Sequence, residues 1–382
     1  MKTIYLDNAA TTPVDKKVVE AMLPYFSEKF GNASSQHTLG LEAKRELERS
    51  RDVIAKALGA KSEEIIFTSG GTEANNFAIK GAIWATGKKH IITTKIEHDC
   101  VLNSSKWLEK QGCRVTFLDV DKEGFINLEQ LKKEITPETA IVSVIHANNE
   151  IGTIQDIKAI GEICRGNGVY FHTDACQSFT KTELNVKKQN LDLVTLNAHK
   201  IHGPKGVGAL YIRKGIKITP LLHGGGHEQG LRSGTENIPG IVGFAKAVKL
   251  TKSEHVKHMK KLRDKLIDGI LKISNTRLNG ASPESGKRLC NNIDISFNDI
   301  EGEALGGYLD AYGIASSTGS ACSSHTLEPS HVLKAIGLSD LEANSSIRLS
   351  LSRENTEQEI DKVLEVLPKI VIKLRKISPF AK

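Results

Sequence analysis

The sequence LDLVTLNAHKIHGPKGVG, residues 191–208, carries a short apolar run up to Lys200 and then leaves regular structure through glycines and a proline. Lys200 is therefore predicted at the carboxyl end of a buried strand, where open α/β sheets bind ligands. A lysine there loses its charge readily on burial, and the neutral amine can condense with an aldehyde to form a Schiff base. A solvated lysine on a turn is the plainer interpretation of Lys200 taken alone.

A second apolar run, GVYFHTDACQ at residues 168–177, delivers Asp174 at its carboxyl end. A carboxylate in that place can pair with a protonated pyridine nitrogen. Pyridoxal phosphate enzymes need a lysine that binds the cofactor and an acid beside its ring nitrogen, so that the ring withdraws electrons from the substrate α-carbon. Asp174 and Lys200 meet that need if they lie on neighbouring strands.

The composition bounds the class of protein. A chain of 382 residues exceeds the size at which one core usually stops growing, which favours two domains. The net charge of +7 is spread without a basic tail or an arginine and aromatic alternation, which argues against nucleic-acid binding. The apolar runs are too short for a membrane span and the first residues lack a signal-peptide core, so we expect no membrane association and a cytoplasmic protein.

The cysteines show no C-x-x-C pair and no secretory context, which predicts reduced thiols. They are Cys100, Cys113, Cys164, Cys176, Cys290 and Cys322. The first five fall in or beside predicted elements and are expected to pack as small hydrophobes. Cys322 differs because its surroundings, SSTGSACSS at residues 316–324, are small or polar and favour an accessible loop.

Strand-like and helix-like segments alternate through the first part of the chain, which predicts a mainly parallel sheet with helices on both faces. The expected strands are residues 64–68, 90–94, 114–118, 141–145, 169–172, 191–196 and 207–212. The last two are too close for a helical crossover and should pair antiparallel. The expected helices and later strands are a helix from the N-cap Asp15 to Gly31, a helix at 41–58, a helical run at 238–273, strands at 292–297 and 346–351, and helices at 302–312 and 356–377.

Polar residues follow several of these strands. SGGTE at residues 69–73 offers backbone amides at a helix N-terminus, and we interpret it as a phosphate cradle, although a glycine pair alone is more often a turn. His98 follows the next strand and could lie on a flat cofactor or shuttle a proton, with a structural histidine as the equal alternative. The glycine-rich stretch at 220–239 is predicted to be a functional loop or an interface.

The sequence resembles the cysteine desulfurases of the NifS and IscS type, which are class V aminotransferases of the fold-type I pyridoxal phosphate enzymes. The matching stretches are YLDNAATTP at 5–13, FTSGGTE at 67–73, EH at 97–98, HANNEIG at 146–152, DA-x-Q at 174–177, HKI-x-GPKG at 199–206, RSGTEN at 232–237 and STGSAC at 317–322. The resemblance implies a seven-stranded, mainly parallel sheet in a large domain at 15–257. A smaller α+β domain would comprise 1–14 and 258–382 and carry the cysteine loop at about 315–327.

The resemblance also implies the site. Lys200 would bind pyridoxal 5'-phosphate as a Schiff base, Asp174 would pair with its ring nitrogen, His98 would stack on the ring, and Cys322 would be the nucleophile. The other implied contacts are Gln177 to the phenolic oxygen, Gly71, Thr72, His199 and the partner subunit's Thr235 to the phosphate, and Asn149 and Arg348 to the substrate carboxylate. Asn197 stands where a phosphate-binding serine is common, and its amide can also donate.

The implied activity is removal of sulfur from L-cysteine by a homodimer, giving L-alanine and a persulfide on Cys322. The sulfur would pass to an iron–sulfur scaffold protein or another acceptor, for cluster assembly, other thio-cofactors or tRNA thiolation. Cys322 would also serve as a transient iron–sulfur ligand. Selenocysteine lyase, or another lyase or aminotransferase of the family, is the alternative, and Cys322 discriminates against it. A non-catalytic partner that uses Cys322 only as a cluster ligand is the rival from another class, and the presence of both Lys200 and Asp174 argues against it.

Overall fold

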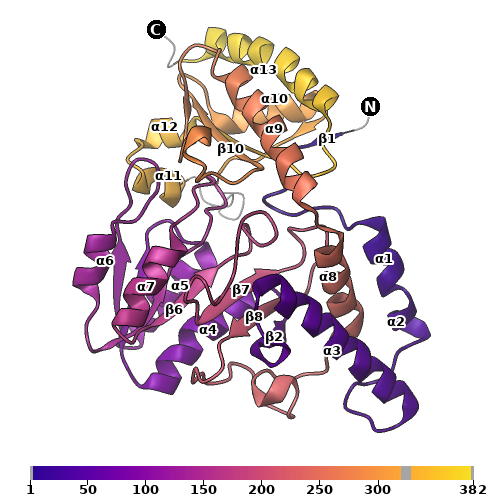
Figure 1. The fold of residues 1–382 in the computed structure, drawn as a ribbon. Coiled ribbons are helices and arrows are strands. Elements are labelled where there is room, and N and C mark those ends of the chain that lie inside the picture. The colour runs from indigo at the N-terminus through magenta and orange to yellow at the C-terminus, as the bar shows by residue number, and fades with distance from the viewer. Residues whose placement is uncertain (1–2, 320–327, 380–382) are drawn as a thin grey trace.

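A seven-stranded sheet forms the centre of the protein, whose computed structural model describes residues 3–319 and 328–379 (Figure 1). The strand order is β2-β8-β7-β6-β5-β3-β4. The strands are β2 (Ile65–Thr68), β3 (His90–Thr94), β4 (Arg114–Leu118), β5 (Thr139–Ser143), β6 (Tyr170–Asp174), β7 (Leu193–Asn197) and β8 (Gly208–Ile212). β8 runs antiparallel to both β2 and β7, and the other pairs are parallel, so the predicted antiparallel pair is confirmed.

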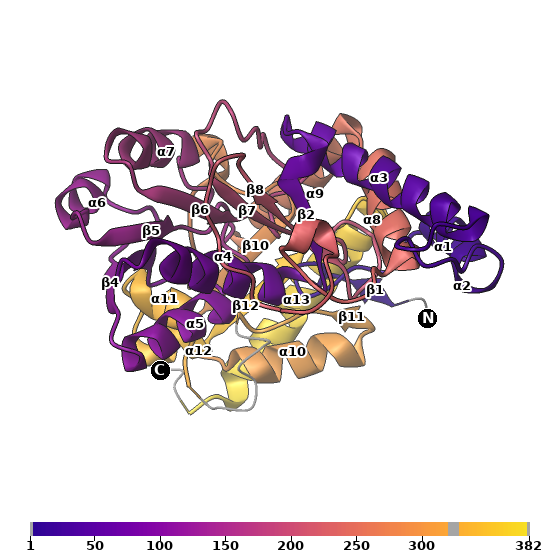
Figure 2. The ribbon, with the colours of Figure 1, turned by 90° about the horizontal axis from the view of Figure 1, so that it is seen from below.

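Helices cover both faces of this sheet, as the alternation of segments predicts. The helices are α3 (Thr38–Leu58), α4 (Gly71–Thr86), α5 (Asp99–Lys110), α6 (Leu128–Glu134), α7 (Ile157–Gly166) and α8 (Ile238–Leu250). Figure 2 shows α4 and α5 on one side of the strands and α6 and α7 on the other. Alternate side chains of each strand therefore enter different cores: Ile66 packs with α4, whereas Phe67 packs with α3.

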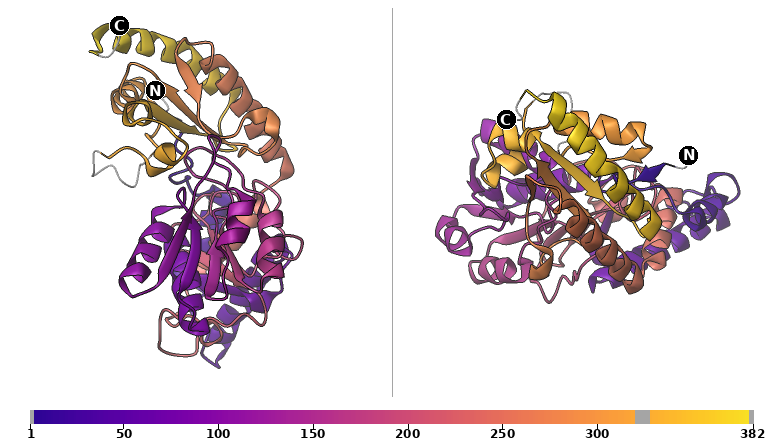
Figure 3. Two further views of the ribbon diagram at one scale, coloured as in Figure 1. Left: turned by 90° about the vertical axis from the view of Figure 1, so that its left-hand side faces the viewer. Right: turned by 90° about the horizontal axis from the view of Figure 1, so that it is seen from above.

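A smaller sheet lies at the other end of the molecule, where the orange and yellow elements gather (Figure 3). Its strand order is β12-β10-β9, and it is antiparallel throughout. Its elements are β9 (Thr276–Leu278), β10 (Asn292–Phe297), β12 (Ser346–Ser350), α9 (Ser253–Ile270), α10 (Gly302–Ala311), α11 (His331–Ala335), α12 (Asp340–Asn344) and α13 (Glu357–Ile377). The predicted domain boundary at 257 and 258 falls within α9, whose Leu262 packs in the core of the smaller sheet.

The N-terminal segment belongs to this second part of the molecule. β1 (Ile4–Tyr5) pairs in parallel with β11 (Ile314–Ala315), and Leu6 lies in the core of the smaller sheet. The chain then crosses to the larger sheet and enters α1 (Lys16–Met22), which packs on α8. Residues 6–14 are thus a strap between the two sheets.

Three helix predictions need correction. The single helix expected up to Gly31 is two, α1 and α2 (Pro24–Ser27), because a proline lacks the amide that would continue the hydrogen-bond ladder. The second helix begins at Thr38, earlier than expected, since the His37 side chain caps Gly40. The run at 238–273 breaks at Thr251, which is extended, into α8 and α9. The predicted N-cap Asp15 and the end at Gly59 are confirmed.

A helix that crosses a bilayer must be both long and apolar. Within residues 3–319 and 328–379, each helix is too short or too polar to do so.

Candidate active site

The carboxyl ends of the parallel strands meet at one edge of the larger sheet, and the predicted polar residues lie there. Asp174 is the last residue of β6, Asn197 is the last of the adjacent β7, and His98 follows β3 as the N-cap of α5. Lys200 comes three residues after β7, in a turn, and is half-buried. Asp174 and Lys200 therefore lie at or just after the ends of adjacent strands, as the sequence predicts.

Asp174 is held by two hydrogen bonds and is only 5% exposed. The buried Asn75 of α4 donates from Nδ2 to Asp174 Oδ2 over 2.7 Å, and the backbone N–H of Cys176 donates to Oδ1 over 2.9 Å. These bonds fix the direction of the carboxylate. The sequence motifs gave no indication of Asn75, although its place one helical turn after Gly71 puts both residues on the same face of α4.

The two predicted histidines beside Lys200 are uncharged near neutral pH. Burial, with a smaller contribution from the charge of Lys200, lowers the pKa of His199 to about 4. Burial also lowers the pKa of His98, whose Nδ1 accepts a hydrogen bond from the backbone N–H of Cys100 over 3.2 Å. A neutral, oriented imidazole at the N-terminus of α5 suits stacking on an aromatic cofactor.

Glu97, the residue before His98, is a buried acid to which the sequence motifs assign no role. Its Oε1 accepts from Thr94 Oγ1 and from the backbone N–H of Ile145, each over 2.8 Å, while Oε2 has no partner among the described residues. Burial raises its pKa to about 8. Glu97 thus ties the end of β3 to the segment that follows β5.

The N-terminus of α4 forms a cradle that fits a phosphate. A Cβ added at Gly71 would lie 2.7 Å from Cys176 Sγ and 3.7 Å from Asn197 Nδ2, so only glycine allows this close approach. Asn197 is buried, and its Oδ1 has no partner in the described parts of the chain. The backbone amides and the dipole of the helix N-terminus match a phosphorylated cofactor. Asn197 Nδ2 lies beside them and can donate to the same group.

Gln177, Asn149 and Arg348, which were predicted to contact the cofactor or the substrate, come from three segments. Gln177 Nε2 donates to the carbonyl of Ala9 over 2.9 Å, so its amide is anchored on the N-terminal strap. Arg348 lies in the middle of β12 and donates from Nη1 to the carbonyl of Asn149 over 3.3 Å. The smaller sheet therefore contributes Arg348 to the edge of the larger one.

Thr235 is exposed in the loop between β8 and α8 and lines a cavity with Thr68 and Ser69 near the cradle. Cys322, with most of its predicted loop, lies outside the described residues. Among the residues that are described, no group of three or more His, Cys, Asp and Glu side chains could hold a metal ion.

The other five cysteines are free thiols, as predicted. Cys164, Cys176 and Cys290 are buried, whereas Cys100 and Cys113 are partly buried. Cys100 borders the site, since its Sγ accepts from Asn75 Nδ2 over 3.1 Å. Burial raises the pKa of Cys100 to about 12, so this thiol stays protonated and unreactive.

Comparison with known proteins agrees with this geometry. Residues 4–363 match the family described as aminotransferase class-V. The cysteine desulfurase IscS of Methanosarcina thermophila is 53% identical over 383 residues, covering 99% of this chain and 94% of that protein. A solved NifS-like protein is 41% identical with a TM-score of 0.91, covering 97% of this chain and all of that one. A solved complex of SspA with cysteine is 38% identical, with a TM-score of 0.83, over 93% of this chain and 100% of that chain.

The fold and the family match define the class: the chain belongs to the class V aminotransferases, enzymes that depend on pyridoxal phosphate. Within that class, the chain is about half identical to cysteine desulfurases over nearly its whole length. It is therefore a cysteine desulfurase of the NifS and IscS type. The resemblance carried by the sequence motifs is confirmed.

Proposed function

We propose that the protein binds pyridoxal 5'-phosphate at Lys200 and transfers the sulfur of L-cysteine to Cys322. The observation that carries the proposal is the fixed carboxylate of Asp174, held by Asn75 and Cys176 at the end of the strand beside Lys200. When bound, the cofactor supplies an electron sink for the substrate α-carbon. The relative SspA, solved with cysteine, supports L-cysteine as the ligand.

The residues of the chain then have separate roles. Asp174 would hold the proton of the ring nitrogen, Gln177 would contact the phenolic oxygen, and the neutral His98 would lie on the ring. The cradle at the N-terminus of α4 would bind the phosphate with Gly71 and Thr72, joined by Asn197 and His199. The amine of Lys200 would then remove a proton from the substrate α-carbon and return it.

On the substrate side, Arg348 and the side chain of Asn149 would bind the carboxylate. The Cys322 thiolate would attack the substrate sulfur, so that a new S–S bond forms while the C–S bond breaks. The electron pair of the broken bond stays with the substrate carbon, which gains one proton to become the methyl group of L-alanine. The sulfur remains on Cys322 as a persulfide and leaves on a protein acceptor, for which an iron–sulfur scaffold is our first candidate. Transient iron–sulfur ligation by Cys322 belongs to the same proposal.

We further propose a homodimer. Leu23, Phe26 and Phe30, on and beside α2, are 58%, 63% and 65% exposed, which is unusual for large apolar side chains so close in sequence. The loop with Thr235 is anchored on α3, because the buried Glu228 pairs with Arg51 of that helix over 2.6 Å. A second copy covering this face would bring its own Thr235 toward the phosphate cradle. Sedimentation of the active protein as a monomer would contradict the dimer.

The test of the activity is a single turnover with L-cysteine, followed by mass spectrometry of the protein and assay of L-alanine. One alanine per site and one sulfur atom added at Cys322 are expected. Sulfur on another cysteine, or alanine without persulfide, would refute the proposal. A ratio of kcat/KM that strongly favours L-selenocysteine over L-cysteine would support the selenocysteine lyase alternative.

A further inference from the structure

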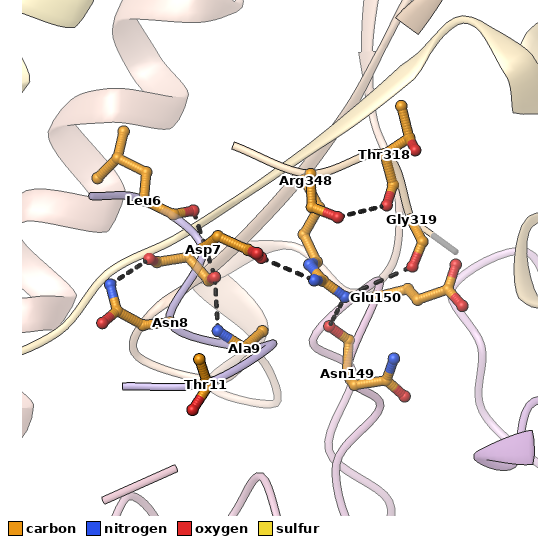
Figure 4. Close-up of polar contacts among 12 residues, drawn as sticks. Leu6, Asp7, Asn8, Ala9, Thr11, Asn149, Glu150, Thr318, Gly319 and Arg348 are labelled. Atoms are coloured by element: carbon orange, nitrogen blue, oxygen red, sulfur yellow. Dashed lines mark hydrogen bonds and ion pairs between the residues drawn. The ribbon is translucent and has the colours of Figure 1, made fainter. Parts of the chain in front are cut away.

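Arg348 is a buried guanidinium with incomplete hydrogen bonding. Its side chain is 2% exposed, and Nη2 donates to Asp7 Oδ1 over 2.9 Å. Nη1 reaches only the carbonyls of Asn149 and Gly319, at 3.3 and 3.4 Å, and the buried Nε has no partner among the described residues (Figure 4). A guanidinium carries five N–H donors, so the contacts that Arg348 makes with described residues leave donors for a ligand oxygen.

The main chain around Asp7 is fixed from both sides. The backbone N–H of Ser350 donates to the carbonyl of Leu6 over 2.7 Å, and the backbone N–H of Asn8 donates to the carbonyl of Ser350 over 3.2 Å. One residue further, the carbonyl of Ala9 accepts from Gln177. Figure 4 shows the Asp7 carboxylate pointing at the guanidinium from this strap, on the side opposite Asn149. The carboxylate therefore has little freedom to move away from Arg348.

Two other acids lie near Arg348 but are poor counter-charges. Asp294 is opposite Arg348 in the β10–β12 register, yet burial raises its pKa to about 7, and its Oδ1 accepts from Asn279 over 2.8 Å. Burial also raises the pKa of Glu150, whose Oε2 accepts from Ser330. Of the described residues, Asp7 is the one whose carboxylate forms an ion pair with Arg348.

We propose that Asp7 is a positioning residue for the substrate carboxylate, acting through Arg348. It holds Nη2 and compensates the buried charge in the resting enzyme, so that Arg348 meets a carboxylate in a fixed orientation. The inference rests on the proposed function, in which Arg348 binds the carboxylate of L-cysteine. It adds that the N-terminal strap, which also holds Gln177, sets the geometry of that contact.

The test compares Asp7→Ala and Asp7→Asn with wild type in the cofactor-loaded protein. We expect Asp7→Ala to raise KM for L-cysteine by about 10- to 100-fold, the loss typical of a charge-assisted hydrogen bond, with a smaller effect on kcat. Calorimetric titration should show the same loss of affinity for L-alanine, which keeps the carboxylate, and no loss for cysteamine, which lacks it. Asp7→Asn keeps an acceptor oxygen for Nη2 and should recover most of the L-alanine affinity.

Asp15→Ala is the matched control. Asp15, the residue that follows the strap, pairs with Arg353, and its side chain is 20% exposed, as is that of Asp7. We expect this variant to lower the melting temperature without changing the ratio of L-alanine to cysteamine affinity. The inference is overturned if Asp7→Ala leaves L-alanine binding unchanged, if cysteamine weakens equally, or if Asp15→Ala reproduces the effect. A wild-type protein that binds L-alanine but never desulfurates L-cysteine would refute the proposed function and leave the role of Asp7 standing.

Discussion

Removing the side chain of Asn75 should destabilise the protein much more than removing that of its neighbour Asn76. Asn75 is fully buried and donates to Asp174 Oδ2 over 2.7 Å. A hydrogen bond to a charged group contributes about 1.5–3 kcal/mol, and its loss leaves a buried carboxylate oxygen without a donor. We therefore expect Asn75→Ala to lower the free energy of unfolding by about 2–3 kcal/mol.

Asn76→Ala is the control because Asn76 occupies the same helix but donates only to the carbonyl of Thr72, at the surface. Its cost should stay within about 0.5 kcal/mol. Urea unfolding of the cofactor-free protein, followed by circular dichroism, measures both values. A third variant, Asn75→Asp, places a carboxylate against Asp174 and should cost more than Asn75→Ala. Equal losses for Asn75→Ala and Asn76→Ala would show that Asn75 does not hold Asp174.

Three further predictions concern buried charges and the thiols. Burial raises the pKa of Glu97 to about 8, above the unfolded value of about 4.3. Wild-type stability should therefore fall by up to about 1.4 kcal/mol per pH unit between these values, and Glu97→Gln should lack that slope in urea midpoints. Glu228→Gln should lower the free energy of unfolding in urea by about 3–5 kcal/mol, because it leaves the charge of Arg51 buried without a partner. Adding Arg51→Met to the same chain should restore most of that stability. A loss below about 1 kcal/mol for Glu228→Gln alone would contradict this prediction. Cys322→Ser should show no persulfide by mass spectrometry after one turnover, whereas Cys100→Ser should keep it.

The strands of the larger sheet were predictable because both faces of that sheet are covered. Such strands read as continuous apolar runs, and their carboxyl ends must meet at one edge. The apolar runs of β7 and β6 are therefore enough to single out Lys200 and Asp174 from the sequence alone. Helix ends were less predictable, since the apolar spacing of α1 continues past Leu23 and hides the break before Pro24. The break at Thr251 has neither glycine nor proline to mark it.

The hydrogen-bond partners of the site residues could not be predicted from the sequence. Asn75 and Asp174 are 99 residues apart, and their contact depends on how α4 lies across β6. No local rule of spacing links such residues, because side-chain pairing rules hold within one helix or between adjacent strands. Only the packing of α4 on the sheet brings the two side chains together.

Asp7 is a partial exception, and it shows what a sequence can still reveal about such a contact. In the stretch YLDNAATTP at residues 5–13, Asp7 is the lone charged residue. A carboxylate within an otherwise uncharged segment that packs against a core must find a cation or several donors, since burying it alone is too costly. The sequence therefore predicts that a partner exists, and the fold identifies it as Arg348, 341 residues further along the chain. The same reasoning explains the conservative rescue expected of Asp7→Asn, because an amide oxygen supplies the acceptor although it cannot supply the charge.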